Sequence, residues 1–182
     1  MALPHLLSLI LLLLLAVGVV ATDTRSLREA ANGTGIYVGS SMNYPYLTED
    51  GYYKQVGAQQ YNLLTAGNAC KMGAIWKDYT HYDFTKCDYV ISFAEANDMA
   101  VRGHNLVWVT DKSTLLPAFV REEKNATTLE SRLLEYIDSV VTHVGERAFA
   151  WDVINEAISD KPDELIKHSP WSKIDDFVCK AF

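Results

Sequence analysis

The amino-acid sequence predicts an α/β fold built on parallel strands. Short apolar runs alternate with longer segments in which apolar residues recur at helical spacing. The short runs are of the kind found in strands buried on both faces. Repeated strand–helix units of this kind favour parallel pairing through right-handed crossovers.

Four strands and four helices are expected after the N-terminal region. The strands are expected over residues 36–41, 63–66, 101–108 and 149–154. The helices are expected over residues 52–61, 87–97, 129–144 and 175–182. The helix over 129–144 has the clearest apolar stripe, formed by Leu133, Leu134, Ile137, Val140, Val141 and Val144.

Two architectures contain such units, an open doubly wound sheet and a (β/α)8 barrel. The ends of the expected strands carry a group of polar and aromatic residues: Ser40, Ser41, Asn68, Lys71, Trp108, Asn155 and Glu156. A barrel gathers its functional residues from the ends of several strands. By contrast, the first strand is not followed by the glycine-rich phosphate loop of a nucleotide-binding sheet. We therefore predict a (β/α)8 TIM barrel.

The predicted barrel is incomplete. A complete one needs ~250 residues in eight strands, whereas residues 22–182 supply about the first four β/α units. The sequence stops within an expected helix at Ala181-Phe182, which we interpret as truncation. Four strands would leave two parallel edges open, so self-association is expected if the half barrel exists by itself.

Residues 1–21 are expected to be a secretory signal peptide. An apolar run over residues 6–20 ends in Val19-Val20-Ala21, a small-residue pattern suited to cleavage. The run has 15 residues, fewer than the ~20 of a membrane-spanning helix. An uncleaved anchor is the alternative. Cleavage after Ala21 gives a secreted, extracellular protein with no membrane attachment.

Composition and modification signals agree with secretion. The net charge of −7 without a basic cluster argues against nucleic acid or an anionic membrane as a partner. Glycosylation sequons begin at Asn32 and Asn125. In an oxidising compartment Cys70 and Cys87 can close a short loop. Cys179 then remains as a buried thiol, which we favour, or forms an intermolecular bridge.

The expected strand over residues 101–108 has an unusual row of side chains. Alternation places Arg102, His104, Leu106 and Trp108 on one face. In a packed core each polar group needs a partner, so a hydrogen-bonded core histidine and a packed tryptophan are one interpretation. At the mouth of a barrel the same row suits hydrogen bonding to sugar hydroxyls and stacking on a sugar ring.

The expected strand over residues 149–154 leads into Asn155 and Glu156. Alternation places Asp152 and Glu156 on one face, and we expect Asp152 to pair with Arg102 on the neighbouring strand. A raised pKa is expected for Glu156 if it is partly desolvated beside Trp108 or another carboxylate. Such a group suits a general acid that protonates a glycosidic oxygen, and Asn155 suits hydrogen bonding to a sugar hydroxyl.

Four motifs together resemble glycoside hydrolase family 10, the secreted endo-β-1,4-xylanases. Trp151-Asp152-Val153-Ile154-Asn155-Glu156-Ala157 resembles the family's strand-4 signature, and residues 102–108 resemble its strand-3 motif. Thr65-Ala66-Gly67-Asn68-Ala69-Cys70-Lys71 is similar to the strand-2 motif, and Ser169-Pro170-Trp171 to the loop after strand 4. The likeness runs in the family's order from about residue 36 to the last residue.

The resemblance implies a role for each matched residue. Glu156 would be the acid/base. The sugar on the non-reducing side of the cleaved bond would be contacted by Asn68, Lys71, His104 and Trp108. The family is retaining, so a nucleophile ~5–5.5 Å from the acid/base is required, and the resemblance assigns it to a seventh strand beyond this sequence. The reaction needs no cofactor, and the histidine and cysteine spacings predict no metal site.

Three positions depart from the family pattern. Gly67 stands where the family carries a glutamate, which removes a hydrogen-bond acceptor for the sugar. Val109 and Asp111 replace the usual histidine and glutamine after the strand-3 motif. These departures fit either an altered glycan preference or relaxed selection on a decaying copy.

The sequence therefore predicts a secreted endo-acting glycoside hydrolase that cleaves β-1,4-xylan-type polysaccharide by a retaining two-carboxylate mechanism. The expected partner is a β-1,4-linked, xylan-like polysaccharide. One alternative is a truncated or degenerate, non-catalytic glycan-binding protein. Another is a barrel glycosidase of the same mechanistic type that acts on a different β-linked glycan.

Overall fold

The centre of the protein is a four-stranded parallel sheet, seen in a computed structural model that describes residues 24–110, 116–175 and 177. The strands are β1 (Gly39–Met42), β2 (Leu63–Ala66), β5 (Ala100–Trp108) and β6 (Ala150–Asn155). They lie in the order β1-β2-β5-β6, and every pair is parallel. Spatial order therefore follows chain order, as in a barrel, whereas a doubly wound sheet reverses direction at a switch point.

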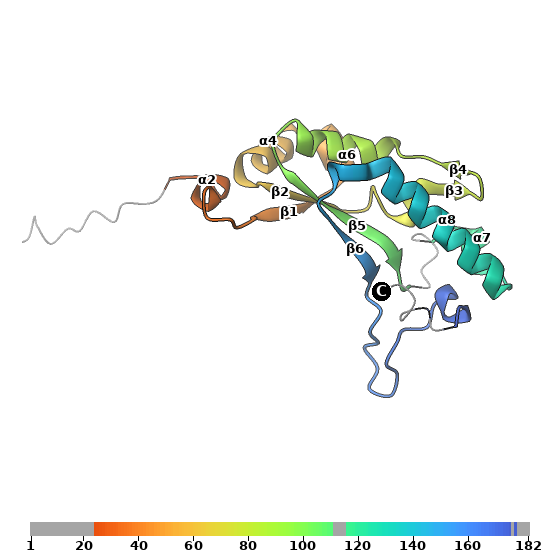
Figure 1. Cartoon of the computed structure of the whole chain (residues 1–182). Coiled ribbons are helices and arrows are strands. Elements are labelled where there is room, and N and C mark those ends of the chain that lie inside the picture. Colours follow the sequence, from red (N-terminus) through yellow and green to blue (C-terminus); the bar gives the residue numbers. More distant parts are fainter. Residues whose placement is uncertain (1–23, 111–115, 176, 178–182) are drawn as a thin grey trace, which may run out of the picture.

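Three long helices connect successive strands. They are α4 (Gly51–Gln60), α6 (Thr85–Glu95) and α8 (Ala126–Val144), and all three lie on the same side of the sheet (Figure 1). The Asp50 side chain caps α4 by accepting hydrogen bonds from the backbone N–H groups of Tyr52 and Tyr53. Asn125 caps α8 in the same way, and α8 ends at Gly145, whose positive φ of 56° favours glycine. The expected strands and these three helices are thus present.

Short elements fill the connections between the long ones. They are α2 (Leu27–Ala31), α3 (Tyr44–Glu49), α5 (Met72–Ile75), the hairpin of β3 (Trp76–Asp78) and β4 (His81–Tyr82), α7 (Ala118–Glu122), η1 (Gly145–Arg147) and η2 (Pro170–Lys173). The sequence did not predict them, because elements of two to six residues are too short to establish a hydrophobic period. The signal peptide expected at 1–21, Cys179, and most of the helix expected over 175–182 lie outside the described residues.

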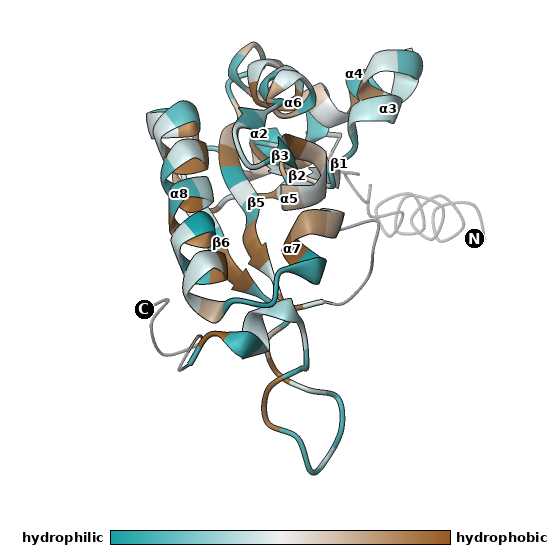
Figure 2. Ribbon diagram, turned by 90° about the vertical axis from the view of Figure 1, so that its right-hand side faces the viewer, coloured by the Kyte–Doolittle hydropathy of each residue, from teal (hydrophilic) through white to brown (hydrophobic). Residues whose placement is uncertain are grey.

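The hydrophobic core lies between the sheet and its helices. Leu64 and Ala66 of β2, Val90 of α6 and Val101 of β5 are at most 3% exposed. Figure 2 shows hydrophobic residues along β5 and β6 and hydrophilic residues over much of α8. Within the part of the chain that is described, no helix is both long enough and apolar enough to cross a membrane.

The buried face of α8 differs in part from the expected stripe. Its buried residues are Leu129, Leu133, Tyr136, Val140 and Val144. Leu134 and Val141 were expected on that stripe but are 60% and 41% exposed, so the prediction is wrong for them. Tyr136 takes part in the core because it stacks on Trp76 of β3, with 5.1 Å between ring centres. The helix is therefore turned further toward the hairpin than the apolar pattern indicates.

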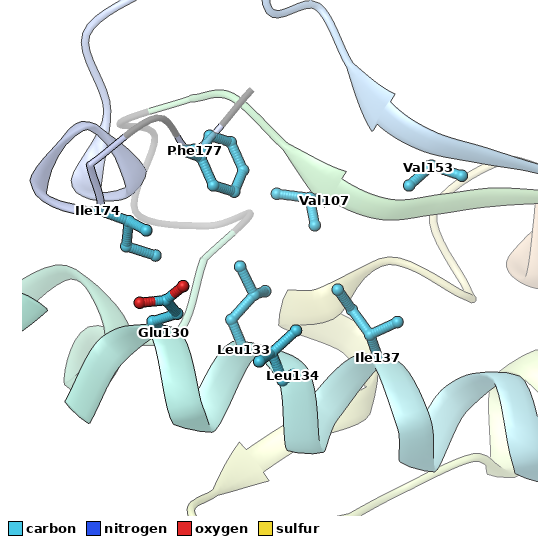
Figure 3. A pocket seen from close by; sticks show the side chains of 8 residues that line it. All are labelled: Val107, Glu130, Leu133, Leu134, Ile137, Val153, Ile174 and Phe177. Atoms are coloured by element: carbon cyan, nitrogen blue, oxygen red, sulfur yellow. The ribbon is translucent and has the colours of Figure 1, made fainter. Parts of the chain in front are cut away.

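The edge of the sheet at β6 has an apolar hollow beside α8. A cavity of about 240 Å³ lies there, and Figure 3 shows Leu134 and Ile137 of α8 facing Val153 of β6 across it. Val153 is 37% exposed and Leu134 more so. The outer side of β6 is therefore a strand edge flanked by accessible apolar side chains.

Candidate active site

The candidate site residues lie at the carboxyl ends of neighbouring strands. Asn68 and Lys71 follow β2, Trp108 ends β5, Asn155 ends β6 and Glu156 comes next. Trp108 and Asn155 are register partners in the sheet. Because the strands are parallel, their carboxyl ends meet at one edge, the place where a barrel carries its functional groups. Sequence analysis had selected these five residues, and the fold places them along this edge.

Lys71 connects the β2 end of this edge to the β5 end. Its Nζ donates a hydrogen bond to Asn68 Oδ1 at 2.9 Å and lies 4.1 Å from the centre of the Trp108 ring. A cation over an indole face is held by the electrostatic attraction of the ring. Burial lowers the pKa of Lys71, while the negative charge of Glu156 acts in the opposite direction. Lys71, Trp108 and Glu156 therefore belong to one electrostatic group.

Glu156 has an unusual backbone and an ionised side chain. Its φ of 55° lies in the left-handed region that non-glycine residues rarely adopt, and such positions gather at functional sites. The pKa of Glu156 is lowered, most strongly by the nearby indole N–H of Trp108, which does not reach full hydrogen-bond geometry. The Lys167 ammonium, 3.5 Å from Glu156 Oε2, lowers it further.

The sequence-based expectation of a raised pKa for Glu156 is therefore wrong for this structure. The side chain is 53% exposed, and the upward effect of burial on its pKa is smaller than the downward effect of the Trp108 N–H. A hydrogen-bond donor and a cation both face the carboxylate and favour its charged form. The cation was missed because it comes from the loop after β6, and a contact across a loop leaves no periodic signal in the sequence.

Asp152 holds Arg102 and His104 on the face of the sheet away from the long helices. Its carboxylate accepts a hydrogen bond from Arg102 Nε at 3.0 Å and a second from Arg102 Nη2. The other carboxylate oxygen pairs with His104 Nδ1 at 2.8 Å. Burial acts to raise the pKa of Asp152, but the bonds to His104 and Arg102 outweigh it and keep the pKa below its ordinary value. The expected Asp152–Arg102 pair is thus present.

His104 is not joined to the group around Glu156 by any direct polar contact in the described structure. It lies four positions before Trp108 on β5, but their register partners Asp152 and Asn155 are only three positions apart on β6 because the register shifts between them, which corresponds to ~10 Å along a strand. With Nδ1 bonded to Asp152, its Nε2 remains available on the same face. His104 is therefore oriented by Asp152 of the neighbouring strand β6. A ligand would have to extend along the sheet to reach both His104 and Glu156.

The loop after β6 returns to the site through two residues that the motifs did not identify as functional. The buried Trp171 donates from its indole nitrogen to the backbone carbonyl of Trp108 at 3.0 Å. Lys167, whose N–H donates to the carbonyl of Ala157 at 2.8 Å, carries its ammonium between Glu156 and Asp160. The loop is thereby fastened to the ends of both β5 and β6.

Replacing Lys167 by methionine is expected to raise the pKa of Glu156, because the variant lacks the cation that stabilises the carboxylate. The shift can be followed by ¹³C NMR titration of labelled glutamate, with Glu156→Gln identifying the signal. Lys161→Met is the matched control, since Lys161 lies in the same loop but pairs with Glu164 at 3.2 Å. A pKa that falls or stays constant in Lys167→Met would contradict this account.

The cysteine pair and the two glycosylation sequons are also located. Cys70 and Cys87 form a disulfide, as the sequence indicated, and both are buried. It ties the loop that carries Asn68 and Lys71 to the first turn of α6. Asn32, after α2, and Asn125, before α8, are both exposed, so each sequon is accessible.

Two of the three departures from the family pattern can be placed. Val109 is 2% exposed and its N–H donates to the carbonyl of Asn155 at 3.0 Å, so it joins β5 to β6 in the core. Gly67 follows β2 and lies against the side chain of Asn43. Asp111 lies outside the described residues. Among the described residues, no three His, Cys, Asp or Glu side chains come together as metal ligands do.

Comparisons with known proteins agree with the geometry. The sequence profile of Glycosyl hydrolase family 10 matches residues 26–182. Endo-1,4-beta-xylanase B of Paenibacillus barcinonensis is 31% identical over 169 residues, which are 89% of this chain and 48% of that protein. Beta-1,4-xylanase of Dictyoglomus thermophilum is 36% identical over 133 residues, 72% of this chain and 36% of that protein. The chain spans about half the length of these relatives, or less.

Solved structures show the same partial match. Xylanase 10B of Thermotoga petrophila RKU-1, determined in complex with xylobiose, superposes with a TM-score of 0.78 at 32% identity, covering 88% of this chain and 49% of that one. Xylanase XynB of Paenibacillus barcinonensis gives a TM-score of 0.76 at 30% identity, covering 89% and 49%. These matches confirm an incomplete (β/α)8 barrel. With its ordered motifs, its sheet and its profile match, the chain belongs to glycosyl hydrolase family 10.

Proposed function

We propose that this chain is the acid/base-bearing part of a secreted endo-acting enzyme that cleaves β-1,4-xylan-type polysaccharide with retention. The observation that carries the proposal is the cluster at the strand ends, where Glu156 lies beside Trp108 and within the electrostatic reach of Lys71. Relatives that match over most of this chain are named as endo-1,4-beta-xylanases, which supports a xylan-type substrate.

The proposed reaction uses Glu156 twice. A second carboxylate attacks the anomeric carbon while Glu156 gives its proton to the departing glycosidic oxygen, so one sugar–oxygen bond breaks as a glycosyl–enzyme bond forms. Glu156 then takes a proton from the water that releases the sugar. Asn155, Asn68 and Lys71 are suited to bonding sugar hydroxyls, and Trp108 to packing on the ring.

The lowered pKa of Glu156 implies a second role for the nucleophilic carboxylate, which is to raise that pKa. With Trp108 and Lys167 beside it, Glu156 is ionised at neutral pH and is a poor proton donor. A second negative charge ~5–5.5 Å away raises the pKa of a carboxyl group. We place this group on a part of the protein outside these 182 residues, since the chain spans about half of its relatives.

A non-catalytic glycan-binding protein is the second candidate. The ionised, half-exposed Glu156 favours it, because the residues described can bind a sugar without transferring a proton to it. The open edge at β6, with Leu134 and Val153 accessible beside it, favours self-association in that case. The two candidates differ in turnover, and both take a neutral polysaccharide as partner and need no cofactor.

Expression in a secreting eukaryotic host tests the proposal. For the complete protein that carries these 182 residues, we expect a product in the medium without residues 1–21 and a mobility shift on N-glycosidase treatment, because Asn32 and Asn125 are exposed. We also expect it to release oligosaccharides from xylan rather than from glucan or mannan. Hydrolysis of glucan or mannan alone would assign a different β-glycan. Binding to xylan without release would favour the non-catalytic candidate, and light scattering on the same product measures self-association. Retention of an unglycosylated product in the cells would contradict secretion.

A further inference from the structure

Gly67, the residue after β2, makes room for a polar side chain from another strand end. A Cβ atom at this position would lie 2.2 Å from Oδ1 of Asn43 and 2.8 Å from its Cγ. Asn43 comes directly after β1, and the backbone N–H of Gly67 donates to the carbonyl of the neighbouring Met42 at 2.9 Å. The amide of Asn43 therefore occupies the space that any side chain at position 67 would need.

The amide of Asn43 has no structural task of its own in the described structure. Asn43 precedes α3 as its N-cap residue, yet its side chain makes no capping hydrogen bond, although asparagine is among the preferred caps. Its hydrogen bonds in the described structure come from the backbone: the N–H donates to the Tyr53 hydroxyl at 3.3 Å, and the carbonyl accepts from the N–H of Leu47 at 3.1 Å. A half-buried amide without partners keeps its capacity for two donated and two accepted hydrogen bonds.

Asn43 lies at a cavity next to the strand ends that carry the candidate site. The cavity has a volume of about 400 Å³ and is lined by Asn43, Tyr44, Pro45, Tyr46, Asn68, Ala69, Ala74 and Lys86. Asn68 in turn holds Lys71, so the cavity continues the line that runs from Glu156 past Lys71. Tyr46 is 56% exposed, so its ring is accessible at this cavity.

The lining has the chemistry of a sugar subsite. Sugar rings present hydroxyl groups at their edge and C–H groups on their face. Amide groups form hydrogen bonds with the hydroxyl groups. Tyrosine rings pack on the C–H face and also offer a phenol hydroxyl. A few fixed polar groups among aromatic side chains are the usual composition of a site for a small neutral ligand.

We propose that Asn43 is a sugar-binding residue, that Gly67 is required so that its amide can reach the ligand, and that this cavity takes one unit of the β-1,4-linked chain beyond the unit at Asn68 and Lys71. The inference rests on the proposed function. It also revises the interpretation of Gly67. The family glutamate at this position is absent, but Asn43 at the end of β1 supplies a polar group in its place.

Calorimetric titration of the chain with xylotriose tests this subsite without requiring turnover. Asn43→Ala is expected to weaken binding by about 3–10-fold, the effect of losing a hydrogen bond or two. Gly67→Ala is expected to weaken it similarly, because its Cβ displaces the amide. Adding Gly67→Ala to Asn43→Ala is expected to cost little more, since the amide it would displace is already gone.

Gly57→Ala is the matched control. Its Cβ would lie 2.2 Å from Met42 Cε, an equal steric load directed at an apolar side chain, so binding is expected to be unchanged. In the unaltered chain the side-chain N–H₂ signal of Asn43 is expected to shift in NMR spectra as xylotriose is added, which a purely structural asparagine would not show.

The outcomes separate this inference from the function on which it rests. Binding by the unaltered chain with equal affinity in Asn43→Ala would overturn the subsite and leave the proposed function standing. Equal weakening by Gly57→Ala and Gly67→Ala would assign the loss to general disturbance and also overturn it. No binding of xylotriose by the unaltered chain would overturn the subsite, whereas the proposed function is overturned when the complete protein releases no oligosaccharides from xylan.

Discussion

The Glu156→Gln variant is expected to hydrolyse xylan about 10²–10⁴-fold more slowly than the unaltered protein, in whichever complete form carries the activity. Glutamine keeps the shape of the side chain beside Trp108 and Lys167. Its amide is not acidic enough to protonate the leaving oxygen. The measurement is the initial rate of reducing-sugar release from xylan, with circular dichroism to establish that the variant is folded.

The choice of substrate makes the Glu156→Gln result diagnostic. An aryl xyloside whose phenolate leaves without protonation needs no general acid, so the first chemical step should be affected least on such a substrate. Azide is an anion and needs no base to remove a proton, so its addition is expected to restore part of the second step. A Glu156→Gln protein that hydrolyses xylan at the original rate would place the acid/base elsewhere.

Removal of the Cys70–Cys87 disulfide is expected to lower the free energy of unfolding by about 3 kcal/mol. The two cysteines are 17 residues apart, and closing a loop of this length restricts the unfolded chain by about that amount. In a domain of this size the corresponding fall in Tm is about 6–12 °C. Cys70→Ala/Cys87→Ala is the suitable variant, because serine would bury an unpaired hydroxyl at two positions that are at most 2% exposed.

A reductant provides the control for the disulfide experiment. Dithiothreitol is expected to lower the Tm of the unaltered chain, measured by thermal unfolding, and to leave the Tm of the double alanine variant unchanged. A double variant with the same Tm as the oxidised, unaltered protein would contradict a stabilising role of the disulfide. Because Cys70 lies one residue before Lys71, loosening this link is also expected to broaden the NMR signals of the Lys71 loop.

β2, β5 and β6 could be predicted to within one residue at each end because apolar residues recur in each. β1 begins at Gly39, three residues after the expected start, because its residues Gly-Ser-Ser-Met do not form an apolar run. The limits are clear at α8, which begins at Ala126, three residues before the expected start. Its first turn is made by a capping asparagine rather than by apolar residues, and only the cap geometry reveals it. The inward turn of Tyr136 depends on the β3–β4 hairpin, whose strands of three and two residues leave no periodic signal.

The site was predictable where strand ends determine it and unpredictable where loops do. Asn68, Lys71, Trp108 and Glu156 follow from knowing where strands stop. The pKa of Glu156 is lowered first by Trp108 and further by Lys167, eleven residues along the chain, and the role of Gly67 depends on Asn43 at the end of a different strand. Contacts of this kind arise from the packing of segments that the sequence does not relate to one another.

The sequential order of the sheet has a consequence for how the chain acquires its structure. Each strand pairs with the one made just before it, in registers that join Gly39 to Leu63, Leu63 to Ala100 and Arg102 to Ala150. The pairings among these four strands therefore need no distant segment, and each one closes a loop of moderate length, which keeps the entropy cost of each step small. A ribosome-bound chain can therefore complete one strand–helix unit at a time, in the order in which the units are synthesised.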